Sequence, residues 1–501
     1  MEQITNTYLR DLAVIYHHID NKGLLFDEPL MSILRTDISN KIRVLLEELS
    51  FSWNCKVYLG VNKEYSKLQD SINLNSPQKL LLKLKDIGFN VPKIRTKNKE
   101  TYEVEYKESV QELVLRKIFA ETGSNDIKKL LEIAELKTLL GRYIDSSRVR
   151  CTFYSCYNTA GTITGRRGCK KHTFGCGGNG QTFPTHYGTD SSCYKFGQDF
   201  LRGIISRPGK LFFKVDQMSA EDWPVSALAE NRKALDELCN QVDRHTNLAS
   251  FIFGIPIASK SSSEWKDSIE RYLGKKSRHA FNYGMRGTTM SESLAKEGFS
   301  ISPEKCQTLL DKVDQYDPSV ERIFHKYVRD EVFSEQMLRT PFGRERHFHG
   351  LRNNDSNYKI FNEAYSYIPQ SVVADNTGFA VYRLGQQQGG DIVNECHDSI
   401  TQEIYNELGS VLDCFNRTRD SFDRSITFHN GITINIPIEA EIGYNFKDTV
   451  KIKPFTEEGI KLAYEKLRDT FVPPNYDFLQ QSDFNLIGEN ECVEKITELA
   501  P

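Results

Sequence analysis

The sequence predicts an α+β fold in which many helices accompany a few short strands. Apolar residues recur at helical spacing through residues 1–50, and helical patterns dominate residues 219–338. Residues 210–215 instead form an apolar, strand-like run. Two more strand candidates, 391–395 and 399–404, are joined through His397 and Asp398 at a predicted tight hairpin. Separate runs of helix and of strand are typical of the α+β class.

The remaining segments follow in chain order. Ser76 and Pro77 are a good N-cap and first helical residue, so they predict a helix over 78–85. Residues 90–107 are polar and extended, and 108–144 have the pattern of two helices. Short strands and loops are expected over 148–235, with a Gly/Cys/Thr-rich insertion at 165–193, and a helix over 359–388. No repeat is visible, and the mixed-charge stretch from about 447 suggests no role.

Composition indicates an ordinary globular protein. The chain has 501 residues, of which 39% are hydrophobic and 27% charged. It contains no run of about 18 apolar residues and no signal-peptide pattern at its start, so no membrane association and a cytoplasmic location are expected. Eleven cysteines at irregular spacing favour reduced thiols over a disulfide framework.

The net charge of −3 is unusual for a nucleic-acid-binding protein, which commonly has a basic excess. The basic residues are nevertheless clustered, at 93–99, at 166–171 and at 271–278. Each cluster by itself is compatible with a solvated loop. An acidic remainder around a basic cleft is equally compatible with an enzyme that acts on DNA.

Two aspartates stand at the ends of predicted strands. Asp216 follows the apolar run 210–215, where a lone carboxylate is costly to bury without a metal ion or a partner. Asp398 lies in the turn between two strand candidates. Ordinary interpretations exist, because Asp216 could cap the helix that follows and Asp398 could form a turn. Two strand-end carboxylates 182 positions apart (398 minus 216) can also converge on two Mg²⁺ ions about 3.5–4 Å apart.

Between these aspartates, four residues recur at every fourth position: Arg271, Lys275, His279 and Tyr283. On an α-helix they lie along one face. Arginine and lysine there offer a bidentate fork and a point charge to a triphosphate, and the tyrosine ring could stack on a base. A solvated basic face is the alternative. Gly284, next to Tyr283, would loosen the end of this helix.

Three blocks around these residues resemble the motifs of family A DNA polymerases, the family of bacterial DNA polymerase I and many bacteriophage replicases. Residues 216–231 (DQMSAEDWPVSALAEN) look like the first palm motif, residues 271–285 like the fingers helix, and residues 395–399 (ECHDS) with Glu403 like the second palm motif. Supporting matches are the thumb-like stretch 72–80 (INLNSPQKL), Thr164-Gly165-Arg166, residues 181–184 (QTFP), His245-Thr246, residues 340–344 (TPFGR) with Arg346, and Pro369-Gln370 with Ala374-Asp375. They span roughly residues 5–447 in collinear order.

The resemblance implies a right-hand polymerase fold, with a palm that contains an antiparallel sheet and with helical fingers and thumb. It divides the chain into an N-terminal helical, palm-associated segment (1–50), a thumb (51–147), the first part of the palm (148–235), fingers (236–340), the second part of the palm (341–447) and a C-terminal extension (448–501).

It also implies a template-directed DNA polymerase that adds deoxynucleotides to a primer 3′-hydroxyl by a two-metal phosphoryl-transfer mechanism. Asp216 and Asp398 would be its catalytic and metal-binding residues, holding two Mg²⁺ ions for which Mn²⁺ could substitute. The residues implied to contact the incoming dNTP are Arg271, Lys275, His279, Tyr283, His245 and Glu221, the last as a steric gate against the ribose 2′-hydroxyl. Those implied to contact primer–template DNA are Arg166, Gln181, Gln370, His397, Lys93, Arg95 and Lys97.

The chain departs from the family pattern at several positions. His279 replaces the usual Phe or Tyr four residues after the fingers lysine, which bears on the sugar pocket. Ser399 stands where a glutamate commonly follows the second palm aspartate. Gln217 and Met218 replace the tyrosine and serine that usually follow the first aspartate, although the spacing to Glu221 is intact.

No proofreading motif of the Asp-x-Glu type precedes the polymerase-like region, so we expect either no proofreading or an exonuclease supplied by a separate polypeptide, with other replisome proteins as further partners. Replication of a phage or viral genome in the host cytoplasm is the expected role. A repair or lesion-bypass polymerase is an alternative. A single-subunit RNA polymerase is disfavoured by Glu221, and a degenerate DNA-binding scaffold by the retention of Asp216 and Asp398 with Arg271, Lys275 and Tyr283.

The insertion at 169–193 carries a set of potential zinc ligands: Cys169, His172, Cys176, His186 and Cys193. Their spacing is irregular and the segment coincides with a region expected to contact the template. Cysteines that serve as ordinary small residues are the alternative interpretation.

Overall fold

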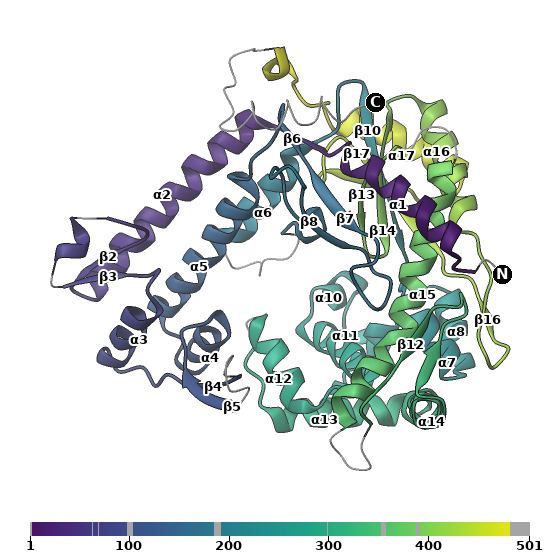
Figure 1. Cartoon of the computed structure of the whole chain (residues 1–501), viewed down its shortest axis with the longest axis horizontal. Coiled ribbons are helices and arrows are strands. Elements are labelled where there is room, and N and C mark those ends of the chain that lie inside the picture. Colours follow the sequence, from purple (N-terminus) through teal and green to yellow (C-terminus); the bar gives the residue numbers. More distant parts are fainter. Residues whose placement is uncertain are drawn as a thin grey trace.

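The largest sheet among the described residues has five antiparallel strands and is named the central sheet; it lies in the upper right of Figure 1. This computed structural model describes residues 3–480 apart from 63, 69, 98–103, 185–191, 298, 352–356 and 387–390. The strand order is β13-β14-β10-β17-β18. In that order the strands are Ile392–Cys396, Ser399–Tyr405, Lys210–Gln217, Ile438–Gly443 and Thr449–Lys451. The sheet therefore unites segments that are far apart in the sequence.

The two faces of this sheet differ because side chains alternate along each strand. On one face of β10, every second side chain is apolar and lies in the largest hydrophobic core: Leu211, Phe213 and Val215. Asp216, one residue further on, points to the opposite face. The antiparallel register places Asp216 directly across from Ser399 on β14 and from Glu439 on β17. This face therefore carries a row of polar side chains across three strands.

Four helices pack around the large core on the apolar face of the sheet. They are α1 (Asn6–Asp20), α15 (Tyr358–Gln386), α16 (Leu408–Phe422) and α17 (Glu457–Thr470). Helix α15 is buried over most of its circumference, from Ala364 to Leu384, as expected for a helix surrounded by other elements. It contacts α1, α16 and β14 and so fixes the N-terminal helix to the sheet.

A first helical group, formed by the N-terminal part of the chain, has a separate core. Its helices are α2 (Glu28–Ser52), α3 (Pro77–Asp86), α4 (Glu112–Thr122), α5 (Asn125–Leu139) and α6 (Ser192–Arg202). Helix α3 begins where the sequence predicts, because the Ser76 side chain accepts a hydrogen bond from the Lys79 amide and Pro77 occupies the first turn. Phe212, on the polar face of β10, joins this core and connects the group to the sheet.

A second helical group contains the middle of the chain. It comprises α7 (Asp222–Leu228), α8 (Arg232–Cys239), α9 (Arg244–Phe253), α10 (Ser262–Lys266), α11 (Ile269–Asn282), α12 (Gly287–Lys296), α13 (Pro303–Tyr316), the π-helix η5 (Val320–His325) and α14 (Lys326–Ser334), and is followed by the hairpin of β11 (Met337–Arg339) and β12 (Glu345–His347). Helix α11 packs against α9 and α13. Its N-cap is Ser268, whose hydroxyl accepts from the Arg271 amide at 3.2 Å.

Short elements connect these layers. Strand β1 (Leu24–Phe26) pairs with β6 (Thr152–Phe153) and β9 (Ile204–Ile205), β2 (Lys56–Tyr58) with β3 (Ser71–Asn73), β4 (Lys93–Lys97) with β5 (Val104–Glu108), β7 (Ser155–Asn158) with β8 (Gly168–Lys171), and β15 (Ile426–Thr427) with β16 (Thr433–Ile434). The short helices are η1 (Tyr65–Lys67), η2 (Leu140–Ile144), η3 (Gly180–Thr182), η4 (Ile257–Ser259) and η7 (Asp477–Gln480).

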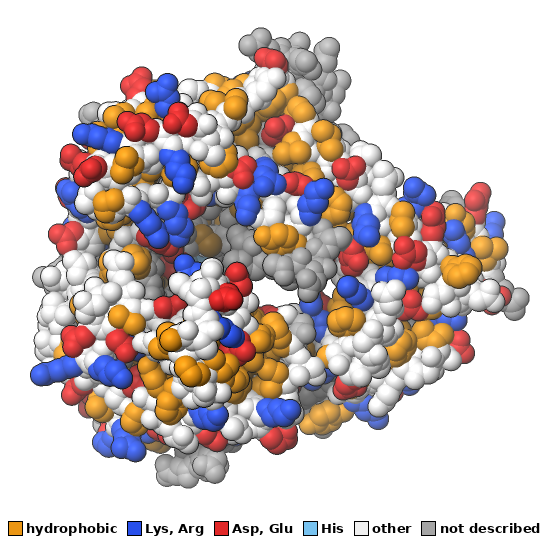
Figure 2. Space-filling model, turned by 180° about the vertical axis from the view of Figure 1, so that it is seen from behind, with side chains coloured by type: hydrophobic (Ala, Val, Ile, Leu, Met, Phe, Trp, Pro, Cys, Tyr) orange, Lys and Arg blue, Asp and Glu red, His pale blue; other side chains and the backbone are white. Residues whose placement is uncertain are grey.

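The two helical groups meet on the side away from the central sheet, where α4 contacts α12 (Figure 1). Figure 2 shows an opening through the middle of the molecule, with Lys and Arg side chains among those at its rim. The sheet and the two groups thus surround a central space.

Most predicted elements are observed. The run 210–215 is β10, the candidates 391–395 and 399–404 are β13 and β14, and 359–388 corresponds to α15. Two details were wrong. Asp216 lies within β10 rather than after it, and Glu221, not Asp216, occupies the N-cap position of α7. Helix α6 and strand β1 were missed, and the stretch after 447, which suggested no role, forms β18, α17 and η7.

Candidate active site

The two predicted metal-binding aspartates lie side by side at one end of the central sheet. Asp216 is the second-to-last residue of β10, and Asp398 lies in the two-residue turn between β13 and β14. The turn is fixed to β10 because the Gln217 amide donates to the Asp398 carbonyl at 3.2 Å. The turn also places His397 at a φ of 62°, a conformation uncommon for a residue with a Cβ. The structure therefore brings the two carboxylates together as predicted.

The environment of these carboxylates favours a bound cation. Burial raises the pKa of Asp216 to about 8, and the neighbouring charges of Asp398 and Glu439 act in the same direction. Burial also raises the pKa of Asp398. Two half-buried acids that repel one another are unfavourable when both are ionised, and a divalent ion would remove that repulsion. The pair therefore fits a metal site by its chemistry.

Glu221 is held in one position by two donors from different elements. Its carboxylate accepts from the guanidinium of Arg166 and from the hydroxyl of Tyr283, at the C-cap of α11. Nε2 of His279 lies 3.8 Å from the same carboxylate, and its ring stands edge-on to Tyr283 at 5.1 Å between centroids. Four predicted site residues therefore form one cluster. It links the loop before β8 that carries Arg166 (the 166 loop), the start of α7 and the end of α11.

Arg271 and Lys275 lie on α11 as predicted, and Lys275 is exposed. Arg271 is engaged by Asp243, because its Nε lies 2.8 Å and its Nη2 3.2 Å from the two Asp243 oxygens. Asp243 is also the N-cap of α9 and accepts from the Thr246 amide at 3.1 Å. Burial alone would raise the pKa of Asp243, but these bonds outweigh it and hold the pKa below its usual value. They also fix the guanidinium against the start of α9.

His245 lies on the first turn of α9, beside Arg271. Both line a pocket of about 210 Å³ that also contacts Met218 and Ser219, the residues that follow β10. Burial, together with Arg278 and Lys275, lowers the pKa of His245 to about 4, so the ring is neutral at physiological pH. Its Nδ1 is buried without a hydrogen-bond partner among the described residues. A pocket that contains the Arg271 guanidinium and the neutral His245 ring therefore begins where the aspartate-bearing strand ends.

Residues predicted to contact DNA occupy several places. Gln181 lies in η3, and its carbonyl accepts from the Cys396 thiol at 3.3 Å, beside the aspartate turn. His397 is in that turn, and its carbonyl accepts from Thr377 at 3.0 Å. Gln370 is half-buried on α15, and Lys93 is exposed on β4 in the first helical group, apart from this cluster. The side chains of Arg95 and Lys97 lie outside what the structure describes.

The described part of the chain gives no support to a zinc site in the 169–193 insertion. Among the residues that the structure describes, no group of three His, Cys, Asp or Glu side chains could hold a metal ion. His186 lies outside the described residues. Cys176 and Cys193 are buried, as expected for ordinary small residues.

Two charged residues near the site were not singled out from the sequence. Asp243 lies two residues before His245 and is the N-cap of α9. An aspartate just before a helical pattern predicts such a cap, so this pattern could have drawn attention to it. Glu439 lies in the alternating stretch 438–442 (IEAEI), which has the pattern of a strand with one polar face. Neither pattern shows by itself that the residue reaches the site.

The family assignment follows from a match over most of the chain. The family model described as DNA polymerase family A matches residues 45–448. The chain belongs to DNA polymerase family A.

Two individual proteins are similar to this family A polymerase chain. "DNA polymerase I, thermostable" of Thermus aquaticus is 23% identical over 417 residues, which are 80% of this chain and 44% of that protein. The chain thus spans less than half the length of this relative. The solved structure of the polymerase domain of Pol1 from M. smegmatis, in complex with a DNA primer-template and dNTP, superimposes with a TM-score of 0.67 at 18% identity and covers 87% of this chain and 70% of that one. The predicted right-hand polymerase fold is confirmed.

The helices were also considered as possible membrane-spanning segments. Within the described ranges, the helices of this family A polymerase chain are all too short or too polar to span a lipid bilayer.

Proposed function

We propose that this chain is a template-directed DNA polymerase that adds deoxynucleotides to a primer 3′-hydroxyl. The observation that carries the proposal is the placement of Asp216 and Asp398 side by side, with a pocket lined by Arg271 and His245 beginning at the end of the same strand. A carboxylate pair beside a pocket that contains an arginine suits phosphoryl transfer from a triphosphate. Membership of DNA polymerase family A supports the same reaction.

Asp216 and Asp398 would hold the divalent ions, since Mg²⁺ and Mn²⁺ prefer carboxylate oxygens. Two such ions would supply activation of the primer hydroxyl and neutralisation of the leaving pyrophosphate. The chain itself supplies the binding site for the triphosphate. Arg271, kept in place by Asp243, Lys275 and neutral His245 would bind its phosphate oxygens.

Glu221 would select the sugar. Because Arg166 and Tyr283 both donate to its carboxylate, the side chain is not free to move away from a ribose 2′-hydroxyl. His279 lies beside this carboxylate and would form the neighbouring wall of the sugar pocket. Tyr283 would stand next to the base pair being formed. This arrangement supports the choice of deoxynucleotides over ribonucleotides.

Primer–template DNA would lie in the central space that the sheet and the two helical groups surround. Arg166, Gln181, Gln370 and His397 would contact it near the aspartates. Lys93, Arg95 and Lys97 would contact backbone phosphates further away. In this proposal the central sheet belongs to the palm (148–235 and 341–447, with 1–50 associated), and the fingers (236–340) and thumb (51–147) are the second and first helical groups.

The biological setting is part of the proposal. Divergent positions such as His279 and Ser399 motivate a phage or viral polymerase that acts in the host cytoplasm.

Primer extension tests the activity directly. A labelled primer on a DNA template is incubated with the purified protein, Mg²⁺ and either dNTPs or rNTPs, alongside Asp398→Ala and the control Asp413→Ala, an exposed acid on α16. We expect dNTP addition by the wild type and the control, and none by Asp398→Ala. Preferred use of rNTPs would contradict the role of Glu221. Tight DNA binding without extension would favour a scaffold.

A further inference from the structure

A third acidic side chain lies directly beside the predicted metal ligands. Strand β10 has β14 on one side and β17 on the other, and Asp216 stands opposite Ser399 on β14 and opposite Glu439 on β17. Residues directly opposite in an antiparallel pair point to the same face, with Cβ atoms about 4.5–5.5 Å apart. Glu439 therefore shares the face of Asp216, and Asp398 adjoins it from the other neighbouring strand.

The strand register places carboxylates on both sides of Asp216. Glu439 lies opposite it on β17, and Asp398 immediately precedes Ser399, which lies opposite it on β14. Asp216 is thus placed between two other carboxylates, one on each side. Ser399, which occupies the equivalent position on β14, adds no charge to this row.

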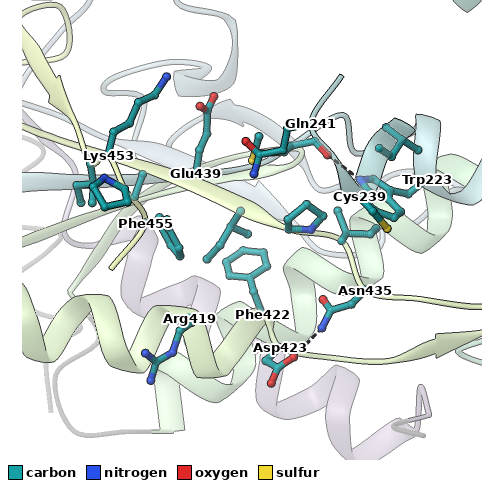
Figure 3. A pocket seen from close by; sticks show the side chains of 18 of the residues that line it. Trp223, Cys239, Gln241, Arg419, Phe422, Asp423, Asn435, Glu439, Lys453 and Phe455 are labelled. Atoms are coloured by element: carbon teal, nitrogen blue, oxygen red, sulfur yellow. Dashed lines mark hydrogen bonds between the residues drawn. The ribbon is translucent and has the colours of Figure 1, made fainter. Parts of the chain in front are cut away.

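Glu439 is free to exchange its present partner. Its oxygens lie 3.2 and 3.3 Å from Nζ of Lys451 on β18, and these two side chains are 41% and 55% exposed. Exposed pairs of this kind contribute about 0–1 kcal/mol and are easily separated. Figure 3 shows the Glu439 carboxylate pointing away from the rings of Phe422 and Phe455, which line the same pocket.

Glu441, two residues further along β17, provides a contrast. One of its oxygens accepts from Thr449 at 2.9 Å, and the other lies 3.6 Å from the amine of Lys214, which is half-buried. It stands opposite Lys214 rather than an aspartate. Glu441 therefore has two partners of its own. It lies two residues along β17 from Glu439, the residue opposite Asp216.

The geometry points to Glu439 as a positioning residue of the divalent-cation site, with Lys451 as its competitor. Glu439 would act on the ion at the β17 side of Asp216 through a bound water molecule. A divalent ion carries twice the charge of the lysine, so its arrival would displace Lys451 from the carboxylate. This inference rests on the proposed function. It also gives a role to β18, which lies beyond residues 45–448 matched by the family model.

Titration with Mn²⁺ tests the inference without catalysis. The free Mn²⁺ signal is followed by electron paramagnetic resonance for the full chain and for Glu439→Gln, Glu441→Gln, Lys451→Gln and Asp216→Asn. Residues that support a metal ligand typically change affinity by about 10–100-fold, so we expect Glu439→Gln to weaken Mn²⁺ binding about tenfold. Glu441→Gln should leave it unchanged. Lys451→Gln should strengthen it, because the competing cation is gone.

The outcomes separate the two proposals. If Asp216→Asn weakens Mn²⁺ binding but Glu439→Gln does not, Glu439 is not part of the site and the inference is wrong. A Lys451→Gln variant that binds Mn²⁺ more weakly would also contradict it, since competition predicts the opposite sign. If the wild type and Asp216→Asn bind Mn²⁺ equally, the metal site itself, and with it the proposed function, fails. Circular dichroism melting curves establish that each variant is folded.

Discussion

At the scale of single residues, carboxylates in and near the site differ in protonation because their surroundings differ. Glu395, three residues before Asp398, is fully buried; one of its oxygens accepts from Tyr16 at 2.9 Å, and the other has no hydrogen-bond partner among the described residues. Burial raises its pKa to about 7, against the opposing charge of Arg167. Its ionisation therefore falls within the range where the enzyme would work.

This environment makes stability depend on pH. The folded pKa of Glu395 lies above its ordinary value of 4.5, so its stabilising contribution is full below about pH 4.5 and is lost as the pH rises through about 7. Glu395→Gln cannot lose a proton. We expect the unfolding free energy of the wild type to fall relative to this variant by roughly 1–3 kcal/mol between pH 5 and pH 8. Denaturant titrations at several pH values measure the difference.

Glu121→Gln, at an exposed position on α4, is the matched control for this comparison. Its stability difference from the wild type should stay constant over the same pH range. A constant difference for Glu395→Gln as well would show that Glu395 is already ionised at pH 5, contrary to the environment that the structure shows.

Residue identity was the part of the site most readily predicted from sequence. Asp216 and Asp398 stand out because each interrupts or ends an apolar run, and Arg271 and Tyr283 because they repeat at helical spacing. Contacts between distant residues were not predictable in this way. Whether Glu439 lies opposite Asp216 depends on the register between two strands that are not adjacent in sequence, and local patterns carry no information about that register.

At the scale of elements, helix α15 fixes the segment that carries Arg166. The neighbouring Arg167 is buried and donates to the Ala374 carbonyl of α15. Gly378, one turn further along α15, leaves room for this guanidinium, since a Cβ at that position would lie 1.8 Å from Nη2 of Arg167. The small residue therefore determines how closely the 166 loop approaches the helix.

Gly378→Ala should displace Arg167 and with it Arg166. Overpacking of a tight site costs about 1–3 kcal/mol, so we expect a loss of that size in unfolding free energy. The matched control is Gly409→Ala on α16, where an added Cβ meets nothing within 4 Å. This control should be neutral or slightly stabilising. Equal stability of the two variants would show that Arg167 has room to move.

Element types were predictable where the signal is local. Ser76 and Pro77 fixed the start of α3, and the apolar run before Asp216 indicated β10. Helix α6 was missed because its segment follows a Gly- and Cys-rich stretch that has the composition of a loop. Strand β18 was missed because only three residues form it, and pairing with β17 rather than its own pattern makes it a strand.

At the scale of the whole molecule, the central sheet acts as the base on which two helical groups are placed. Strand β10 contributes side chains to two cores. Val215 packs in the core on the apolar face of the sheet, and Phe212 packs in the core of the first helical group. The groups meet again where α4 contacts α12, so they enclose the central space of Figure 2. Such an enclosure suits a substrate that is long and passes through.

The fold at this scale could be predicted only through the family resemblance. Local patterns gave an α+β protein with helices in two runs, but not the way these runs surround a common space. That arrangement depends on contacts such as those between α4 and α12, which are far apart in the chain. The resemblance of the motif blocks supplied that arrangement, and the likeness to a solved polymerase domain confirms it.

The central claim is that the chain copies a template, and a single-nucleotide assay tests it most directly. Four primer–template duplexes that differ only in the first unpaired template base are each offered one dNTP at a time, with Mg²⁺ and the purified chain. The account predicts rapid extension by one nucleotide for the four complementary combinations and little for the other twelve. Extension that ignores the template base, or none in any combination, would contradict it.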